Sequence, residues 1–301
     1  MPPSATAGIT RVQAWMLAAR PKTLPAAVAP VLVGSAVAAG EGAFAPLPAA
    51  VALVCALLIQ IATNFANDYF DFVKGADTHE RVGPVRVVAA GIIAPQTVRN
   101  AMIGVLALTF VLGLFLVWIG GWPILAIGVA SIFCAVIYTA GPFPLAYNGL
   151  GDIFVFVFFG IAAVTGTHYV QALAWSPDAL VAALPMGAIS TAILVVNNYR
   201  DIDTDRGAAK RTLAVRMGRA ATRIEYVALL AFAALVPVAQ VLAGGIVRLP
   251  LLLALGSLPL AVPLVRTIYT VTDGPRLNAA LGGTGRLLAL FAILYSLGHL
   301  L

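Results

Sequence analysis

Residues 47–71 read LPAAVALVCALLIQIATNFANDYFD, in which 20 residues without a charge lead directly into an acidic motif. A hydrocarbon layer of roughly 30 Å requires about 20 apolar residues from a helix that spans it. The apolar run therefore predicts a membrane-spanning helix, and the NDYFD sequence at 67–71 marks the point where that helix leaves the membrane.

Similar apolar runs fill the rest of the chain. Of its 301 residues, 61% are hydrophobic and only 10% are charged, and the mean hydropathy of +0.99 lies far outside the range of soluble globular domains. Nine spans are predicted, at about 24–40, 47–66, 99–119, 122–140, 150–171, 179–199, 224–244, 248–270 and 284–301. The predicted fold is an all-α membrane protein that forms one polytopic domain over residues 1–301, with nine transmembrane helices.

Two connections, at about 67–98 and 200–223, are longer and more polar than the others, and both follow an even-numbered span. With a cytoplasmic N-terminus, 17 of the 18 Lys and Arg residues fall on the side of these two loops, and Arg248 alone falls on the other. Basic residues are enriched in cytoplasmic loops. We therefore expect a bacterial inner-membrane protein with both loops cytoplasmic and the C-terminus outside. No basic patch with interleaved aromatics suggests a nucleic acid partner.

Acidic residues are concentrated in the same two loops. Seven of the 12 lie there, namely Asp68, Asp71, Asp77 and Glu80 in the first loop and Asp201, Asp203 and Asp205 in the second. If the preceding helices continue, one polar stripe combines Asn64, Asp68 and Asp71, and another combines Asn197, Asp201 and Asp205. Asp203 points away from its stripe.

Clustered carboxylates at a membrane boundary need a cationic partner, because they repel one another and lose hydration. Oxygen ligands without His or Cys suit Mg²⁺, which commonly binds through one or two carboxylates together with substrate phosphates. The predicted catalytic residues are Asp68, Asp71, Asp201 and Asp205, and Asn64, Asn67 and Asn197 complete the predicted ligands of two Mg²⁺ ions. Metal-bridged diphosphate is a good leaving group, and nearby Lys and Arg would assist.

Solvated loop surface is the alternative explanation for one Asp-rich loop. It explains two such loops less well, because NDYFD at 67–71 and NNYRD at 197–201 agree in three of five positions and both end a predicted span. For Glu80 and Asp203 the surface explanation is preferred.

These motifs resemble the signatures of the UbiA superfamily of intramembrane aromatic prenyltransferases. The first reads NDYFD at 67–71 and continues to Asp77, and the second reads DIDTD at 201–205. The resemblance is strongest to the MenA type, 1,4-dihydroxy-2-naphthoate polyprenyltransferase, in RPKTLP at 20–25, the segment 60–77, GPVR at 83–86 continuing to 91, the segment 138–152 ending NGLGD, and NNYRDIDTD at 197–205 leading into KRTLA at 210–214.

This resemblance implies helices around a central cavity that is open laterally to membrane lipid. It implies Mg²⁺-dependent transfer of a prenyl group from polyprenyl diphosphate to 1,4-dihydroxy-2-naphthoate, with loss of CO₂ and diphosphate, to give demethylmenaquinone. Because residues 139–152 contain no basic residue, phosphate contacts are assigned to Lys22, Arg86, Lys210 and Arg211. The implied substrate-binding residues also include Asp77, Tyr138 and Asn198, and the rings of Tyr69, Tyr138 and Tyr199 are candidates to stabilise a carbocation or, equally, interfacial aromatics.

Other interpretations remain open at this point. Acceptors such as 4-hydroxybenzoate or homogentisate fit the same motifs. A cation-coupled transporter also places carboxylates around a central cavity, but its sites lie near the bilayer midplane, whereas these carboxylates lie at helix ends. The sequence GGTG at 282–285 lacks the strand and lysine of a phosphate loop and predicts a flexible entry to the last helix.

Overall fold

The computed structural model describes residues 9–76, 83 and 85–301, and within them the chain is helical, without strands. The α-helices are α1 (Arg11–Ala19), α2 (Pro25–Gly40), α3 (Pro46–Val73), α4 (Pro95–Gly120), α5 (Trp122–Ile137), α6 (Gly151–Phe156), α7 (Ala163–Ala172), α8 (Pro177–Arg200), α9 (Ile202–Gly207), α10 (Leu213–Gly244), α11 (Ala261–Thr270) and α12 (Gly274–Leu300). Four shorter or tighter segments join them, namely η2 (Pro21–Thr23), η3 (Ala146–Asn148), the π-helical η4 (Val157–Ala162) and η5 (Ile246–Leu260).

Each of the nine predicted spans falls on helical segments of the described chain. Seven helices there are long and apolar enough to cross a membrane, and α2 makes an eighth when it is joined to α1 and η2 across a bend of 49°. The ninth, α5, is apolar but has only 16 residues. Several helices also extend beyond their predicted ends. The α3 helix continues to Val73, because hydropathy detects the apolar part of a helix and not the turns that follow it.

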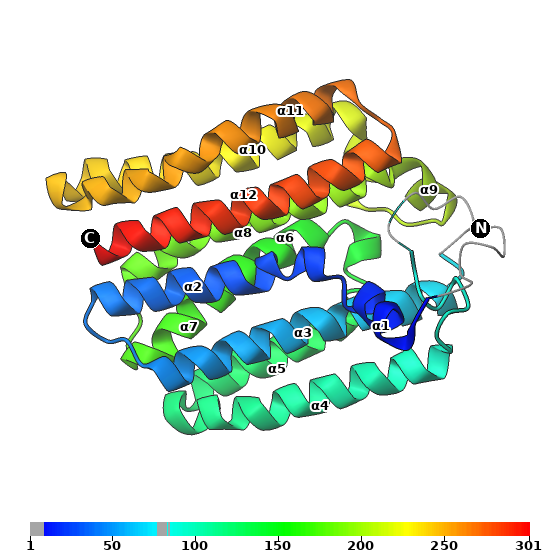
Figure 1. Ribbon diagram of the computed structural model, residues 1–301, viewed down its shortest axis with the longest axis horizontal. Helices are drawn as coiled ribbons and strands as arrows, with labels where there is room; N and C mark the ends of the chain where they lie inside the picture. Colours follow the sequence, from blue (N-terminus) through cyan, green and yellow to red (C-terminus); the bar gives the residue numbers. More distant parts are fainter. Residues whose placement is uncertain (1–8, 77–82, 84) are drawn as a thin grey trace.

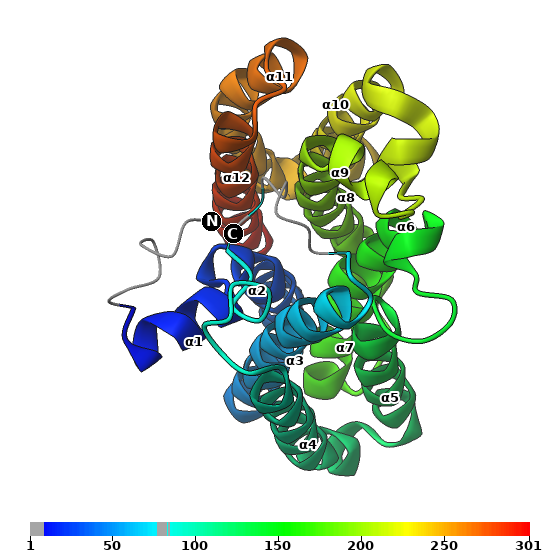
Figure 2. The ribbon, with the colours of Figure 1, turned by 90° about the vertical axis from the view of Figure 1, so that its right-hand side faces the viewer.

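The long helices run side by side along the long axis of the molecule (Figure 1). The C-terminal ends of α3 and α8 lie at one end of the bundle, beside α9 and α1, and the C-terminus of the chain lies at the opposite end. Viewed from the α9 end, α2, α3, α5, α7, α8 and α12 are arranged around a centre (Figure 2). Both acidic motifs are therefore brought to one end of the bundle, which we call the motif end.

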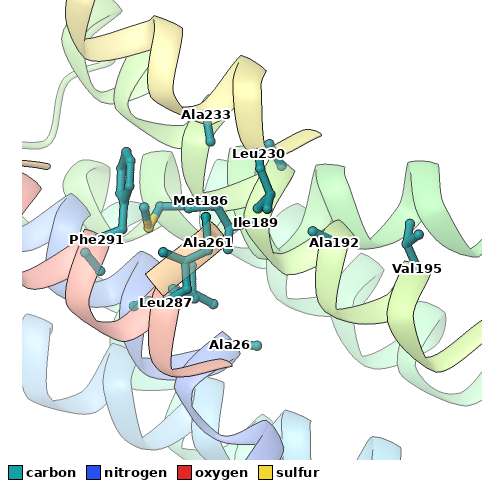
Figure 3. Packing of buried hydrophobic residues seen from close by; sticks show 14 of the residues in the cluster. Ala26, Met186, Ile189, Ala192, Val195, Leu230, Ala233, Ala261, Leu287 and Phe291 are labelled. Carbon is teal, nitrogen blue, oxygen red and sulfur yellow. The ribbon is translucent and has the colours of Figure 1, made fainter. Parts of the chain in front are cut away.

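The core is built around α8. This helix packs against α2, α10 and α12, and Figure 3 shows Met186 and Ile189 of α8 among side chains from neighbouring helices. These neighbours include Leu230 of α10 and Phe291 of α12, and they belong to one buried apolar cluster. Close packing on several sides fixes the position and rotation of α8, and so the direction of the motif at its end.

A contact between two glycines brings the η4 segment close to α8. A Cβ atom added at Gly160 would lie 2.7 Å from Cα of Gly187 and 2.8 Å from the carbonyl oxygen of Ala183. Small residues are typical of such crossings in membranes, where packing drives helix association. At this crossing η4 packs directly against α8. Phe158 and Phe159, the two residues before Gly160 in η4, line the central cavity.

Candidate active site

A cavity of about 400 Å³ occupies the centre of the bundle. Most of its wall is apolar and comes from α2, α3, α4, α5, α7 and α8 and from η4. Both motifs contribute its polar residues, namely Asn64, Asn67 and Asp71 from α3 and Asn197, Asn198, Asp201 and Asp205 from α8 and α9. Arg20, Arg86 and Lys210 line the same cavity. It therefore joins an apolar chamber to a polar region that contains both carboxylates and cations.

Asp71 is the centre of the polar network at the end of α3. Its Oδ2 accepts a hydrogen bond from Arg86 Nη2 at 2.8 Å, and its Oδ1 accepts from Lys210 Nζ at 3.1 Å and from the Tyr147 hydroxyl at 2.7 Å. The side chains of Asp71, Arg86 and Lys210 are all at least nine-tenths buried. Three distant segments of the chain thus meet at one buried carboxylate, whose charge is balanced by two cations.

Two lysines lie close to the ring of Tyr147. Lys210 Nζ lies 4.7 Å and Lys74 Nζ 4.9 Å from its centroid, which allows cation–π contacts. Lys74 also donates to the carbonyl oxygens of Thr139 and Gly141 at 2.7 and 3.1 Å. Burial lowers the pKa of Lys74, and the nearby charge of Asp71 opposes this shift. Lys74 therefore brings a positive charge to the segment 139–152, which has no basic residue of its own.

A tight helix end directs Lys210 toward Asp71. The backbone N–H of Lys210 donates to the carbonyl oxygen of Asp205 at 2.9 Å, and the preceding residue, Ala209, has a left-handed φ of 55°. This pattern is typical of a helix terminus in which a left-handed residue turns the chain back on itself. The turn after α9 thus returns the chain to the cavity.

Asp68 has different contacts from Asp71. Its two carboxylate oxygens accept hydrogen bonds from the backbone N–H groups of Val87 and Val88 at 3.1 and 3.3 Å. Asp68 is 1% exposed and does not line the cavity. In this structure it fixes the segment that carries Arg86, one residue before Val87.

The second motif does not continue as one helix. The α8 helix ends at Arg200, Asp201 has φ −95° and ψ 7°, and α9 begins at the next residue. The expected helical stripe is therefore interrupted at Asp201, although the Asp205 N–H still bonds to the Asp201 carbonyl at 2.7 Å. That bond keeps Asp205 close to one turn from Asp201, and Asn197, Asp201 and Asp205 line the cavity together.

Arg200 holds the carboxylate of Asp201 with two hydrogen bonds. Its Nε donates to Oδ1 at 2.8 Å and its Nη2 donates to Oδ2 at 2.5 Å, an arrangement that fixes both distance and orientation. Nη2 also donates to Asn197 Oδ1 at 2.8 Å. Asp203 instead faces outward with a side chain that is 73% exposed, paired with Arg219 at 2.7 Å, as helical spacing predicts.

The amide residues of α3 are also fixed in place. Asn64 Nδ2 donates to the carbonyl of Ala19 at 2.9 Å and to Thr23 Oγ1 at 3.1 Å. Asn67 Oδ1 accepts from Thr139 Oγ1 at 2.6 Å. These bonds connect α3 to the turn before α2 and to the segment after α5. They hold the end of α3 in place between these two segments.

The remaining predicted residues divide into two groups. Tyr138 and Asn198 line the cavity, whereas Lys22 and Arg211 do not, and Asp77 lies outside the described residues. Of the other aromatic candidates, Tyr69 packs against Phe70 at a centroid distance of 5.0 Å. Tyr199 is fully buried, with Arg219 and Arg223 against its ring.

Sequence reasoning missed Tyr147 and the role of Arg200. Both lie inside segments that were recognised, 138–152 and 197–205, but neither residue type distinguishes a site from a helix end. Their importance depends on which carboxylate each contacts, and only the structure supplies this information.

The donor set fits Mg²⁺ better than a transition metal. In the described part of the chain, no three His, Cys, Asp or Glu residues gather closely enough to hold a metal ion by themselves. The cavity offers oxygen donors on two sides, with Asp71 and the α3 amides on one and Asp201, Asp205 and Asn197 on the other. Mg²⁺ keeps several waters and takes its remaining ligands from a bound phosphate, so one or two carboxylates on each side suffice.

Comparison with known proteins agrees with this arrangement. The model of the UbiA prenyltransferase family matches residues 27–294. The 1,4-dihydroxy-2-naphthoate octaprenyltransferase of Mycobacterium leprae is 39% identical over 279 residues, which cover 93% of each chain. The enzyme of the same name from Escherichia coli is 43% identical over 228 residues, which cover 74% of each chain.

Among solved structures, a UbiA homolog from Archaeoglobus fulgidus bound to DMAPP and Mg²⁺ aligns with a TM-score of 0.64 at 15% identity, over 94% of this chain and 99% of that one. This likeness shows the shared fold. The resemblance deduced from the motifs is confirmed, and the chain belongs to the UbiA prenyltransferase family.

Proposed function

We propose that this chain transfers a polyprenyl group from polyprenyl diphosphate to 1,4-dihydroxy-2-naphthoate, in a reaction that requires Mg²⁺ and yields CO₂, diphosphate and the quinol form of demethylmenaquinone. One observation supports the chemistry above all others: both acidic motifs and three basic residues line one cavity whose wall is otherwise mostly apolar. The acceptor is proposed from the names of the relatives, which share 39–43% identity over most of this chain.

The polar region of the cavity would hold the diphosphate. Arg20, Arg86 and Lys210 line it and supply positive charge for phosphate oxygens. Asp71 on one side, and Asp201 and Asp205 on the other, would hold two Mg²⁺ ions together with the neighbouring asparagines. When bound, Mg²⁺ would supply charge that stabilises the leaving diphosphate.

The apolar wall would hold the prenyl chain and exclude water from the reaction. In the proposed reaction the allylic C–O bond breaks and its electron pair leaves with the diphosphate. The electron-rich naphthoate ring then attacks the allylic carbon and forms the new C–C bond. The carboxylate leaves as CO₂, and the electron pair of its C–C bond returns to the ring, which restores the aromatic quinol with no net loss of a proton. The rings of Tyr138 and Tyr147 line the cavity and would stabilise the developing positive charge.

We also propose that the motif end faces the cytoplasm of a bacterial cell and that the C-terminus lies outside. The distribution of basic residues supports this orientation. Arg248, the one basic residue expected outside, pairs with Asp178 at 2.5 Å near the start of α8, opposite the motif end.

The test is an assay of the purified protein in lipid nanodiscs with labelled polyprenyl diphosphate and Mg²⁺. The panel of acceptors contains 1,4-dihydroxy-2-naphthoate, 4-hydroxybenzoate and homogentisate. We expect prenylated product with the naphthoate alone and none after EDTA treatment. Preferential turnover of a different acceptor would overturn the acceptor assignment, and full activity in EDTA would overturn the metal assignment.

A further inference from the structure

A second, smaller hollow of about 200 Å³ lies between the start of α2 and the first half of α12. Its wall consists of Lys22, Pro25, Asn278, Ala279, Gly282, Gly285 and Arg286. The GGTG sequence at 282–285 was expected to be a flexible helix entry, and this prediction was wrong, because α12 begins at Gly274 and continues through it. Gly282 instead opens the hollow, since a Cβ atom there would meet nothing within 4 Å.

Two basic residues line this hollow. Lys22 and Arg286 are both exposed, and no ion pair to either is found among the described residues. Gly285 packs beside the carbonyl oxygen of Lys22, with 3.5 Å to an added Cβ, so the two basic residues belong to one seam between η2 and α12. Such a pair of cations attracts an anion.

The depth of Arg286 in the membrane indicates which anion. Arg286 precedes the end of α12 at Leu300 by 14 residues, about 21 Å at a rise of 1.5 Å per residue. A hydrocarbon layer of roughly 30 Å that begins at Leu300 would extend past Arg286 toward the motif end. An exposed arginine at this depth must extend its guanidinium to the headgroup layer, where phosphate is its partner.

We propose that Lys22 and Arg286 form a binding site for a phosphate group, and that the phosphate is the headgroup of an anionic membrane lipid. Basic pockets between transmembrane helices on the cytoplasmic side are suited to such headgroups. A soluble phosphate or the diphosphate of the prenyl donor has the same charged oxygens, so the experiment must separate these sources. The site differs from the central cavity, which neither Lys22 nor Arg286 lines.

One residue of the hollow connects it to the second motif. Asn278 Oδ1 accepts from Arg200 Nη1 at 2.6 Å, and the same guanidinium holds both oxygens of Asp201. A lipid that steadies α12 against α2 would therefore also steady Asn278 and Arg200. We expect prenyl transfer to be several-fold faster in bilayers that contain the anionic lipid.

Binding is measured by native mass spectrometry of the purified full chain, titrated with phosphatidylglycerol or phosphatidylcholine. Two kinds of variant test the site. Lys22→Gln with Arg286→Gln removes both charges, and Gly282→Leu fills the hollow while keeping them. The matched control is Arg99→Gln with Arg266→Gln, which removes two exposed charges elsewhere on α4 and α11. Circular dichroism verifies that each variant is folded.

We expect phosphatidylglycerol to bind the parent chain and the control with equal affinity. Its affinity for the variant with both Lys22→Gln and Arg286→Gln, and for Gly282→Leu, should be at least tenfold lower. Equal binding in all four proteins would overturn the site. Displacement of phosphatidylglycerol by inorganic phosphate or diphosphate at equal concentration would overturn the lipid as ligand. Failure of the acceptor assay would leave this result unaffected, because binding is measured without turnover.

Discussion

Lys210 Nζ lies 3.1 Å from Asp71 Oδ1, although 139 residues separate the two in the sequence. Asp71 lies in the last turn of α3, and Lys210 follows α9, the short helix of the other motif. Their contact ties the two motifs together at a single buried ion pair. Several properties of the enzyme can be tested from this contact and its neighbours.

Replacing Lys210 with Met should reduce kcat/KM for prenyl transfer about 100-fold, because the cavity loses a positive charge directed at the diphosphate. The measurement is steady-state turnover with varied prenyl diphosphate. Arg276→Met is the control, since Arg276 is an exposed residue that pairs with Asp273 outside the cavity. Equal losses in both variants would contradict a specific role for Lys210.

Asp71→Asn should abolish Mg²⁺-dependent turnover, whereas Asp203→Asn should stay within about twofold of the parent chain. The two substitutions remove the same charge from different places, one buried on the cavity wall and one exposed beside Arg219. Turnover is measured across an Mg²⁺ titration. Asp201→Asn and Asp205→Asn should resemble Asp71→Asn, and a normal Mg²⁺ response in any of the three would remove that residue from the metal assignment.

Asp68→Asn should act through the segment that follows the first motif. A buried carboxylate that accepts from two backbone amides contributes about 1.5–3 kcal/mol per bond, and an asparagine retains only one oxygen to accept both. We expect faster proteolysis around residues 86–93 and loss of activity that excess Mg²⁺ does not restore. Activity recovered by Mg²⁺, with unchanged proteolysis, would instead make Asp68 a direct ligand.

Gly160→Val should destabilise the bundle, because the added Cβ would lie 2.7 Å from Cα of Gly187, and backbone must move to make room. Overpacking of this kind costs about 1–3 kcal/mol, so the melting temperature in detergent should fall by several degrees. Gly104→Val is the control, since nothing lies within 4 Å of a Cβ atom there. Similar melting temperatures for both variants would show that the crossing tolerates a side chain.

The sequence predicted those features that depend on one segment at a time. Apolar length located the helical segments, of which seven or eight in the described chain are long enough to cross a membrane. Helical spacing separated Asp203 from Asp201 and Asp205. The contacts of Asp68 with Val87 and Val88 could not be predicted in this way, since these two partners are backbone N–H groups about 20 residues away, and backbone groups leave no trace in side-chain periodicity.

The sequence also could not predict that Lys22 and Lys210 lie in different cavities. Both are basic residues next to a span, but one faces the central cavity and the other a different hollow. Which cavity a lysine faces depends on how helices pack around it, and composition does not encode this. Tyr147 was overlooked for the same reason, because its value lies in contacting Asp71 and two lysines at once.

The ion pairs of Asp71 also imply an order of events. A cation bound at this carboxylate would release Arg86 and Lys210 to hold an anion, and an anion bound by those two side chains would leave the carboxylate to a cation. Each ligand would then raise the affinity for the other, which is positive cooperativity carried by one side chain. Metal and diphosphate are therefore expected to bind together, each raising the affinity of the protein for the other.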